Sequence, residues 1–436
     1  MLNKFLFKYI DNSSLIVFRI IFGFLCFAES VGAIFTGWIT KTLVEPKFTF
    51  TFIGFEWLQP LPGNWMYVYY AVMGIFGLLI MVGYKYRFSA FMFFIMWCGV
   101  YFMQKSSYNN HYYLLVLLSG IMVILPAHKY ASLDVKQNPK LKSIAMPAWC
   151  KWIFVIQLFI LYTYASKAKL YPDWLDLSVP TSLMEAKINY PIIGGLLQNG
   201  FMPYLVGYGG ILFDGLIIPM LLFKPTRKYA FFASIFFHLF NSFVFQVGVF
   251  PYLSLAFCLF FFNPETVRNI FLKGKELYTK AEIIVPNYKP ILIGLGSVYF
   301  AIQIVLPLRH HFIPDDVLWT EEGHRLSWRM MLRSKSGYTN FKVVNTATNK
   351  TTPINLTQYL TKKQIRSVNY KPDFMWQFAQ YLKKEYKKKG EDVQVFVSAQ
   401  VSVNGKPHQH LINEKVDLAN IKWNVFKHND WILPSK

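Results

Sequence analysis

Charge is scarce in this sequence, and acidic charge is scarcest. Only 16% of the 436 residues are charged, with 23 Asp and Glu against 45 Lys and Arg, whereas 54% are hydrophobic and 19% aromatic. Soluble domains carry roughly 25% charged residues, so this composition argues against an ordinary soluble protein. The sequence indicates a polytopic membrane protein.

Cysteine is also rare, and several catalytic motifs are missing. The four cysteines (Cys26, Cys98, Cys150 and Cys258) lie in or beside apolar runs, so we expect no disulfide framework and no CxxC metal site. The chain lacks a Walker A loop, a GxGxxG motif after a strand, an HExxH motif and a GxSxG motif. These absences argue against nucleotide-driven transport, the common hydrolase chemistries and a resident metal.

Apolar runs divided by basic loops predict about nine transmembrane helices, or eight if one short run does not span. Lysine and arginine are concentrated in every alternate loop, as expected for cytoplasmic loops, so we place the amino terminus inside and the carboxyl terminus outside. The predicted runs cover about residues 14–37, 65–83, 88–104, 111–127, 149–167, 203–223, 229–247, 248–262 and 290–308.

The composition becomes polar and basic from about His310. The stretch 392–405 alternates apolar and polar residues and ends in Asn-Gly, which predicts a strand and a tight turn. The stretch 373–390 predicts a helix that begins near Pro372 and stops at Gly390. We therefore predict a membrane domain at 1–309 and a mixed, β-rich extramembrane domain at 310–436.

The net charge of +22 fits this topology together with anionic lipid headgroups. The run Lys387–Lys389 is better interpreted as a solvated helix end than as a nucleic-acid patch, and we expect no nucleic-acid partner.

Polar residues at membrane depth are functional candidates because burying them there is costly, although contacts between helices are the standing alternative. For Asp214, Arg19 and Glu29 we favour mutual neutralisation. The other candidates are His111 beside Asn109 and Asn110 at the start of one run, and His238, Asn241 and Gln246 in another.

Two lysines in YTYASKAKLYPDW (162–174), Lys167 and Lys169, lie at the end of an apolar run. A lysine in a low-dielectric site can lose its proton and act as a general base. Alternatively, a lysine at a span end extends its ammonium to the interface and does no chemistry. Position alone favours this second interpretation.

Five motifs in order resemble the vitamin K-dependent gamma-glutamyl carboxylase family with its HTTM membrane domain. The resemblance covers roughly residues 10–345. The motifs are KFTFTFIGFEWLQPLP (47–62), NNHYYLL (109–115), AKLYPDW (168–174), HLFNSFVFQVGVFPY (238–252) and WTEEGHRLSWRMML (319–332).

The resemblance implies a mechanism and its cofactors. A lysine of the membrane domain deprotonates reduced vitamin K, a naphthohydroquinone, and oxygen then adds. The rearranged adduct removes a γ-proton from a glutamate side chain, carbon dioxide captures the carbanion, and the quinone leaves as its epoxide. This chemistry needs a dry pocket.

The resemblance also implies roles for individual residues. The family's KKLxxDW pattern matches KLYPDW and assigns Lys169 as the base, whereas Ala168 replaces the second lysine and Lys167 is displaced by one position. Asn110 and His111 are expected to orient or protonate the glutamate. His238 and Asn241, with Gln246 in the same motif, are expected to line the quinone pocket.

The extramembrane motif is implied to bind the glutamate substrate. We expect contributions from Trp319, His324, Arg325, Trp328 and Arg329, with an arginine pairing with a carboxylate. Gly323, His324, Arg325 and Arg329 differ from the animal pattern, so substrate choice is expected to differ.

Three functions remain open: a carboxylase that is coupled to quinone epoxidation, an epoxidase without carboxylation, and a non-enzymatic quinone- or lipid-binding membrane protein. The expected partners are membrane lipid, a naphthoquinone, a glutamate-containing protein or peptide and a quinone epoxide reductase. The setting favoured is a bacterial inner membrane with the C-terminal domain in the periplasm. A luminal domain has the same topology.

Overall fold

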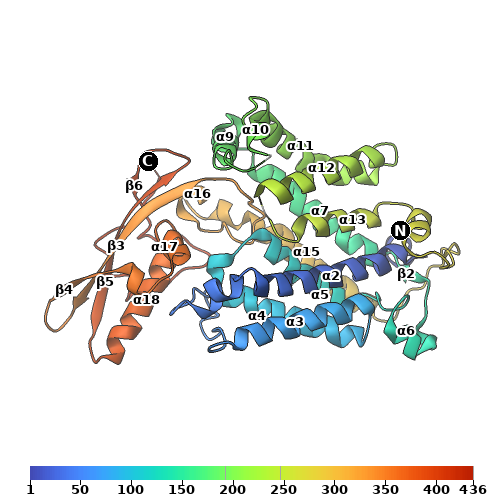
Figure 1. Cartoon of the computed structure of the whole chain (residues 1–436), viewed down its shortest axis with the longest axis horizontal. Helices are drawn as coiled ribbons and strands as arrows, with labels where there is room; N and C mark the ends of the chain where they lie inside the picture. The colour runs from blue at the N-terminus through green and yellow to red at the C-terminus, as the bar shows by residue number, and fades with distance from the viewer. Residues whose placement is uncertain (192, 246, 436) are drawn as a thin grey trace.

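A computed structural model of the chain describes residues 1–191, 193–245 and 247–435. Long helices lie roughly side by side and form most of the molecule, as Figure 1 shows. The larger sheet and the helices that pack on it gather at the end opposite the N-terminus. Long apolar helices together with a C-terminal β-sheet region fit the predicted membrane protein with a β-rich domain. The division at residues 309 and 310 stays a prediction.

Seven described helices are long and apolar enough to cross a membrane. Each of the nine predicted apolar runs contains helix, but two of these helices are short, so the count of nine spans is not confirmed. The long helices are α2 (Ser13–Phe35), α3 (Trp65–Val82), α4 (Tyr86–Met103), α7 (Trp149–Ala168), α11 (Met202–Leu222), α12 (Arg227–Phe245) and α15 (Lys289–Val305), which continues into η5 (Leu306–Phe312); the short ones are α5 (Asn110–Ile124) and α13 (Phe250–Phe257), which continues into η4 (Cys258–Phe260).

Short elements connect these helices. A two-stranded antiparallel ribbon pairs Ile10 with Met146, and a buried ion pair of 2.7 Å joins Asp11 to Lys275 beside it. The connecting elements are α1 (Leu2–Phe7), β1 (Tyr9–Asp11), η1 (Thr40–Val44), η2 (Lys105–Ser107), α6 (Leu133–Gln137), η3 (Pro139–Leu141), β2 (Ala145–Pro147), α8 (Pro172–Leu175), α9 (Ser178–Glu185), α10 (Gly194–Leu197) and α14 (Pro264–Phe271).

Arg19 is fully buried in α2, and its partners differ from the prediction. Its guanidinium donates to the backbone oxygens of Ala127 at 3.0 Å and Ala131 at 2.6 Å. Glu29 instead accepts a hydrogen bond of 2.7 Å from the Tyr112 hydroxyl. The expected neutralisation of Arg19 by Glu29 is therefore wrong, because backbone oxygens of the loop after α5 accept the hydrogen bonds of the guanidinium.

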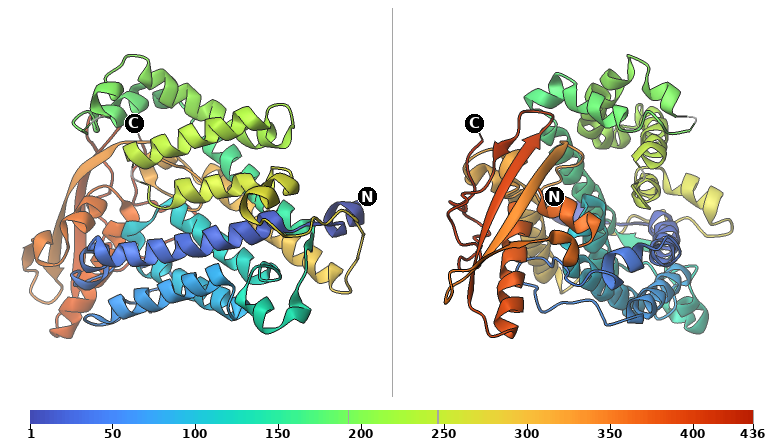
Figure 2. Two further views of the ribbon diagram at one scale, coloured as in Figure 1. Left: turned by 45° about the vertical axis from the view of Figure 1, so that its right-hand side comes forward. Right: turned by 60° about the vertical axis from the view of Figure 1, so that its left-hand side comes forward.

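The extramembrane domain is built on a four-stranded antiparallel sheet in the order β4-β3-β5-β6. Figure 2 shows its helical layer lying along one face of the sheet. The elements are α16 (Val317–Thr320), β3 (Lys335–Asn345), β4 (Thr351–Ile354), η6 (Leu356–Gln358), α17 (Lys362–Val368), α18 (Pro372–Lys388), β5 (Val393–Val403) and β6 (Gln409–His410).

The predicted strand and helix of this domain are confirmed. In β5, Val393, Val395 and Val397 are buried at alternate positions, as one face of a strand requires. They pack against Phe374 and Phe378 of α18. Asn404 and Gly405 after the strand have φ of 54° and 76°, the left-handed pair that a two-residue hairpin turn favours.

The loop between η1 and α3 fastens the two domains together. Phe50 is fully buried in the extramembrane core, with its ring 4.5 Å from that of Phe374. The backbone oxygen of Thr51 accepts a hydrogen bond of 3.0 Å from Gln377 of α18. The aromatic motif at 47–62 therefore anchors α18 to the membrane domain.

Close packing of α2 on α3 depends on glycine. A Cβ added at Gly77 would lie 2.7 Å from the backbone nitrogen of Phe27, whereas one added at Gly74 would lie 3.5 Å from Ser30 Cβ, an ordinary contact. Small residues let helices in a membrane approach closely.

We expect Gly77→Ala to lower the free energy of unfolding by about 1–3 kcal/mol, because the helices must move apart. Gly74→Ala on the same helix is the matched control and should be neutral or stabilise by up to ~1 kcal/mol. Unfolding of the purified protein in detergent measures both. Equal stability of the two variants would contradict this account of the packing.

Candidate functional site

A cavity of about 380 Å³ lies in the membrane domain beside the junction with the extramembrane domain. Its wall is overwhelmingly apolar, and a few polar side chains converge on it, as is typical of small-molecule sites. Residues from α5, α7, α8, α9, α11, α12 and α13 and from the segment after α16 form the wall; among them are His111, Tyr162, Lys169, Trp174, Phe213, Asp214, Phe237, His238, Asn241, Phe250, Met330 and Met331.

Lys169 lies on this wall at the end of α7. Proline cannot continue a helix and favours an extended residue before it; Pro172 follows, and Tyr171 has φ of −141° and ψ of 158°. The side chain of Lys169 is 10% exposed, and its Nζ lies 2.5 Å from Asp214 Oδ2. Nζ also donates to the Ala165 oxygen at 3.2 Å. The ammonium does not extend into solvent.

Asp214 comes from the middle of α11 and is 4% exposed. Asp214 does pair with a cation, but that cation is Lys169 and not Arg19. Sequence reasoning did not give Asp214 a role in the site, although an acid within a span is a functional candidate by default. Asp214 lies 45 residues after Lys169 in the chain, so no local sequence pattern predicts the pair. Only the packing of α11 on α7 brings the two side chains together.

Two predicted histidines face the same cavity. The ring of His111 stacks on Phe250 with centroids 4.2 Å apart, and His238 Nε2 lies 3.1 Å from the Tyr162 hydroxyl. His238 Nδ1 is buried and has no hydrogen-bond partner among the described residues. The structure therefore brings His111 and His238 to one wall with Lys169.

The predicted amides occupy different places. Asn241 lines the cavity and donates to the Phe237 oxygen of its own helix at 2.9 Å. Asn110 lies just outside: its Nδ2 donates to the Arg329 oxygen at 3.0 Å, and its Oδ1 accepts from the Tyr108 hydroxyl at 2.9 Å. Asn110 thus ties α5 to the extramembrane segment. Gln246 lies outside the described residues.

The segment 326–332 closes the cavity on the extramembrane side, and we call it the roof. Met330 and Met331 contribute to the cavity wall. Leu326, Trp328 and Met331 have φ of 62°, 57° and 51°, a left-handed conformation that costs about 1–3 kcal/mol at each residue and gathers at functional sites. Sequence reasoning matched these methionines to the motif but did not assign them to the site.

None of the five residues predicted to bind substrate appears on the cavity wall. Trp319 packs in the extramembrane core, and its indole donates to the Leu433 oxygen at 2.8 Å. Trp328 is fully buried against Tyr113. His324 contacts Arg333, Arg325 pairs with Asp373, and Arg329 contacts His310. Their substrate contacts stay a prediction.

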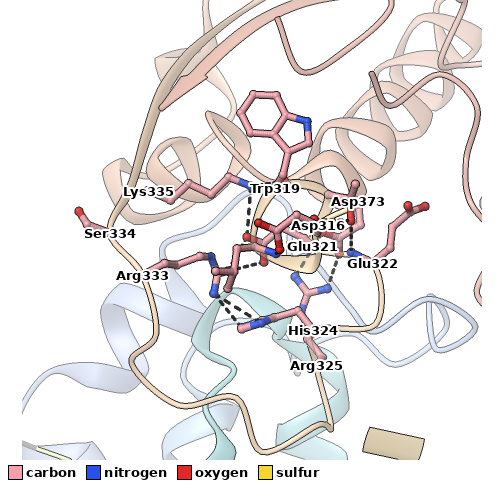
Figure 3. Close-up of polar contacts among 12 residues, drawn as sticks. Asp316, Trp319, Glu321, Glu322, His324, Arg325, Arg333, Ser334, Lys335 and Asp373 are labelled. Carbon is pink, nitrogen blue, oxygen red and sulfur yellow. Dashed lines mark hydrogen bonds and ion pairs between the residues drawn. The ribbon is translucent and has the colours of Figure 1, made fainter. Parts of the chain in front are cut away.

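Figure 3 shows Arg325 directed at the carboxylate of Asp373 and Arg333 directed at that of Glu321. Arg325 binds Asp373 through two bonds of 2.8 and 3.2 Å. Burial alone would raise the pKa of Asp373, but Arg325 and Lys105 lower it to about 2. The carboxylate of Glu321 accepts a hydrogen bond of 2.5 Å from Arg333 Nη2 at Oε2 and one of 3.3 Å from Lys335 Nζ at Oε1. Both carboxylates are therefore held ionised by basic partners.

Lys371 has no such carboxylate partner among the described residues. Its ammonium lies 5.1 Å from the centre of the Phe374 ring. The Lys105 ammonium and the Arg325 guanidinium lie 4.7 Å and 5.5 Å from the same ring centre. Burial, followed by the charge of Arg325, lowers the pKa of Lys371 to about 7. Three cations therefore share the surroundings of one ring, and the carboxylate that pairs with two of them is that of Asp373.

Two family models match the chain. The HTTM domain matches residues 7–265. The lumenal domain of vitamin K-dependent gamma-carboxylase matches residues 288–436. No solved structure matches the chain. The two matches support an integral membrane protein with a lumenal C-terminal domain, and the second match begins just before α15.

The buried pair of Lys169 and Asp214 predicts strong thermodynamic coupling. Lys169→Met leaves a buried carboxylate without its partner, so we expect a loss of roughly 3–5 kcal/mol in the free energy of unfolding. The double variant Lys169→Met/Asp214→Asn should lose less than the sum of the two single losses, by about 0.5–3 kcal/mol. A double-mutant cycle of unfolding in detergent tests this; additive losses would show that the pair does not interact.

The environment of Lys371 predicts a pH-dependent stability. Its pKa is about 7 in the folded state, against an ordinary value of 10.5. Between these values the unfolded chain binds a proton that the folded chain does not, so stability rises with pH. Asp373 and Glu321 do not contribute there, because their lowered pKa values lie below 3.8 and 4.5.

We therefore expect Lys371→Met to reduce the rise in melting temperature between about pH 6.5 and pH 9. Lys105 and Lys335, whose pKa values burial lowers to about 8, remain in the variant, so part of the rise should persist. Lys384→Met, which removes an exposed lysine of α18, is the matched control. Curves for Lys371→Met that run parallel to wild type would refute the expectation.

Proposed function

This chain belongs to the vitamin K-dependent gamma-carboxylase family, since the HTTM model alone matches more than half of it, and we propose on that premise that it is a membrane enzyme that epoxidises a reduced naphthoquinone and carboxylates glutamate. The proposed base is Lys169. The observation that carries the proposal is the pairing of Lys169 with Asp214 on the wall of an apolar cavity.

The cavity fits a naphthoquinone ring in size and chemistry. Its volume of about 380 Å³ lies within the range of roughly 300–1,000 Å³ for small-molecule sites. Phe213 and Phe237 stack at 3.8 Å on its wall and offer a flat aromatic surface. Leu212, Leu216 and Phe236 also line it and are 60%, 48% and 61% exposed on the outer surface of the helices. An apolar tail can therefore reach the cavity from the bilayer between α11 and α12.

When bound, the reduced naphthoquinone supplies an acidic hydroxyl, and its reaction with oxygen supplies a base strong enough for a glutamate γ-proton. Asp214 Oδ2 can take a proton from Lys169 Nζ across their 2.5 Å contact, which leaves a neutral amine and a neutral carboxylic acid. The amine can then accept the hydroxyl proton. A low-dielectric site lowers the cost of this transfer from the ion pair, because it penalises the charged forms of both groups.

Exclusion of water is the second requirement of this chemistry. Met330 and Met331 of the roof and Phe250 of α13 supply apolar wall where polar groups would otherwise admit water. We propose that His111, which stacks on Phe250 and lines the same cavity as Lys169, donates or accepts a proton in this reaction. We propose that His238 and Asn241 orient the ring, and that Gln246 of the same motif assists them.

Glutamate is proposed to approach through the extramembrane segment that holds Trp319, His324, Arg325, Trp328 and Arg329. Carbon dioxide is the proposed second co-substrate besides oxygen. The epoxide product must be reduced before reuse, which calls for a quinone epoxide reductase as a partner. The proposed setting is a bacterial inner membrane, with a cytoplasmic N-terminus and the C-terminal domain in the periplasm.

Two observations favour a second function, epoxidation without carboxylation. Arg325 is already occupied by Asp373, and the five residues expected to bind glutamate are absent from the cavity wall. An enzyme of this kind would keep the lysine chemistry and lose the coupling to glutamate. A quinone- or lipid-binding protein without chemistry is the remaining alternative.

We expect Lys169→Ala to reduce oxygen-dependent conversion of reduced vitamin K to its epoxide by about 10²–10⁴-fold, the usual contribution of a general base. Lys151→Ala removes another lysine of α7, near its other end, and should keep the activity. Purified protein is assayed with labelled bicarbonate and a glutamate peptide. Epoxide together with label in the peptide supports the coupled carboxylase.

Epoxide without label in the peptide would favour the uncoupled epoxidase. Wild-type protein that is folded and binds the quinone, yet forms no more epoxide than Lys169→Ala, would refute both enzymatic proposals. Binding of the oxidised quinone to each variant separates loss of chemistry from loss of the site.

A further inference from the structure

Lys167, the neighbour of the proposed base, faces away from the cavity. Two residues along a helix turn a side chain by about 200°, so Lys167 and Lys169 leave α7 on nearly opposite sides. Lys169 lines the cavity, whereas Lys167 is exposed and its Nζ lies 3.4 Å from His311 Nε2 of η5. The catalytic proposal therefore gives Lys167 no role.

Lys167 belongs to a group of basic side chains that we call the outer basic cluster: Lys167, Arg309, His310, His311 and Arg329. The rings of His310 and His311 lie 4.1 Å apart, and Arg329 Nη1 lies 3.4 Å from His310 Nε2. Arg309 is joined to the same segment through a bond of 3.2 Å from its Nη2 to the Arg325 oxygen.

The outer basic cluster makes no ion pair through its lysine or arginines (Lys167, Arg309 and Arg329) within the part of the chain that the structure describes. The Nε atoms of Arg309 and Arg329 are buried and lack a hydrogen-bond partner. Arg325 and Arg333 nearby each bind a carboxylate. Partly buried arginines that lack a carboxylate partner and leave a buried N–H unpaired are costly, so this arrangement favours an anion from outside the chain.

The position of the cluster indicates where that anion comes from. The cluster lies where α15 and η5 end, and α15 is only 11% buried along its apolar window. Val305 and Phe312 beside the cluster are 61% and 79% exposed. Basic residues are normally concentrated on the cytoplasmic side, whereas this cluster adjoins the lumenal domain. Exposed apolar residues next to unpaired cations match the boundary between lipid tails and headgroups.

We propose that the outer basic cluster binds the phosphate of an anionic phospholipid in the membrane leaflet that faces the extramembrane domain. Arginine and lysine are the side chains best suited to phosphate, and Val305 and Phe312 lie where the acyl chains would pack. A substrate carboxylate fits less well, because Lys167 is directed to the side of α7 away from the cavity.

The test measures lipid binding and does not depend on the proposed enzymatic activity. Full-length protein in mild detergent is titrated with short-chain phosphatidylglycerol, with short-chain phosphatidylcholine and with inorganic phosphate. We expect phosphatidylglycerol to bind more tightly than the other two. Each removed charge near a lipid surface is worth about 1 kcal/mol, so Lys167→Gln should weaken binding roughly fivefold and Lys167→Gln/Arg309→Gln by tenfold or more.

The control Lys383→Gln/Lys384→Gln removes two charges from α18 and should bind phosphatidylglycerol like wild type. Lys167 is exposed, so the single variant tests the proposal even if the double variant does not fold. Undiminished binding in Lys167→Gln would overturn the proposal. Equal affinity for inorganic phosphate would indicate a soluble anion instead, and displacement of the lipid by a glutamate peptide would indicate a carboxylate site; either result would also overturn it.

Discussion

The ion pair between Lys169 and Asp214 is the constraint on which the rest of the structure depends. Two opposite charges buried in an apolar wall are tolerable only while they stay in contact, because each alone would carry a large desolvation penalty. Their contact of 2.5 Å fixes the end of α7 against the middle of α11, and that placement positions the cavity. The same contact gives the proposed chemistry its proton acceptor, since the amine is neutral only if the carboxylate takes the proton. Architecture and proposed catalysis therefore share one interaction.

The sequence predicts the elements of this fold better than the contacts of the site. Each predicted apolar run contains a helix, and the strand at 392–405 and the helix at 373–390 are confirmed, because periodicity and turn residues are local signals. Lys169, His111, His238 and Asn241 reach one cavity, as the motifs imply. The partner of Lys169 could not be predicted, since residues far apart in the chain meet only through helix packing. The same reason explains why Arg19 binds backbone oxygens rather than Glu29, and why Arg325 is occupied by Asp373.

The roof joins the two domains at the point where water must be kept out. Asn110 of α5 donates to the Arg329 oxygen, and the backbone nitrogen of Leu326 donates to the Tyr108 hydroxyl at 2.8 Å. On the other side the Tyr171 hydroxyl donates to the Leu332 oxygen. The motif that contains Lys169 also reaches the extramembrane sheet, since Asp173 accepts a bond of 2.8 Å from Asn404. The residues YPDW after Lys169 therefore connect the cavity wall, the roof and the extramembrane domain.

Acidic residues are scarce, and three buried carboxylates near the cavity and the junction each have basic partners. Asp214 is assigned to Lys169, Asp373 to Lys105 and Arg325, and Glu321 to Arg333 and Lys335. Cations outnumber acids around Asp373 and Glu321, so the excess lies at the junction, whereas the pair at the cavity is balanced. This distribution suits the proposed chemistry, because an uncompensated charge beside the cavity would attract water, whereas the junction can draw anions from substrate or lipid. The outer basic cluster extends the same excess to the membrane surface, where phosphate is the most abundant fixed anion.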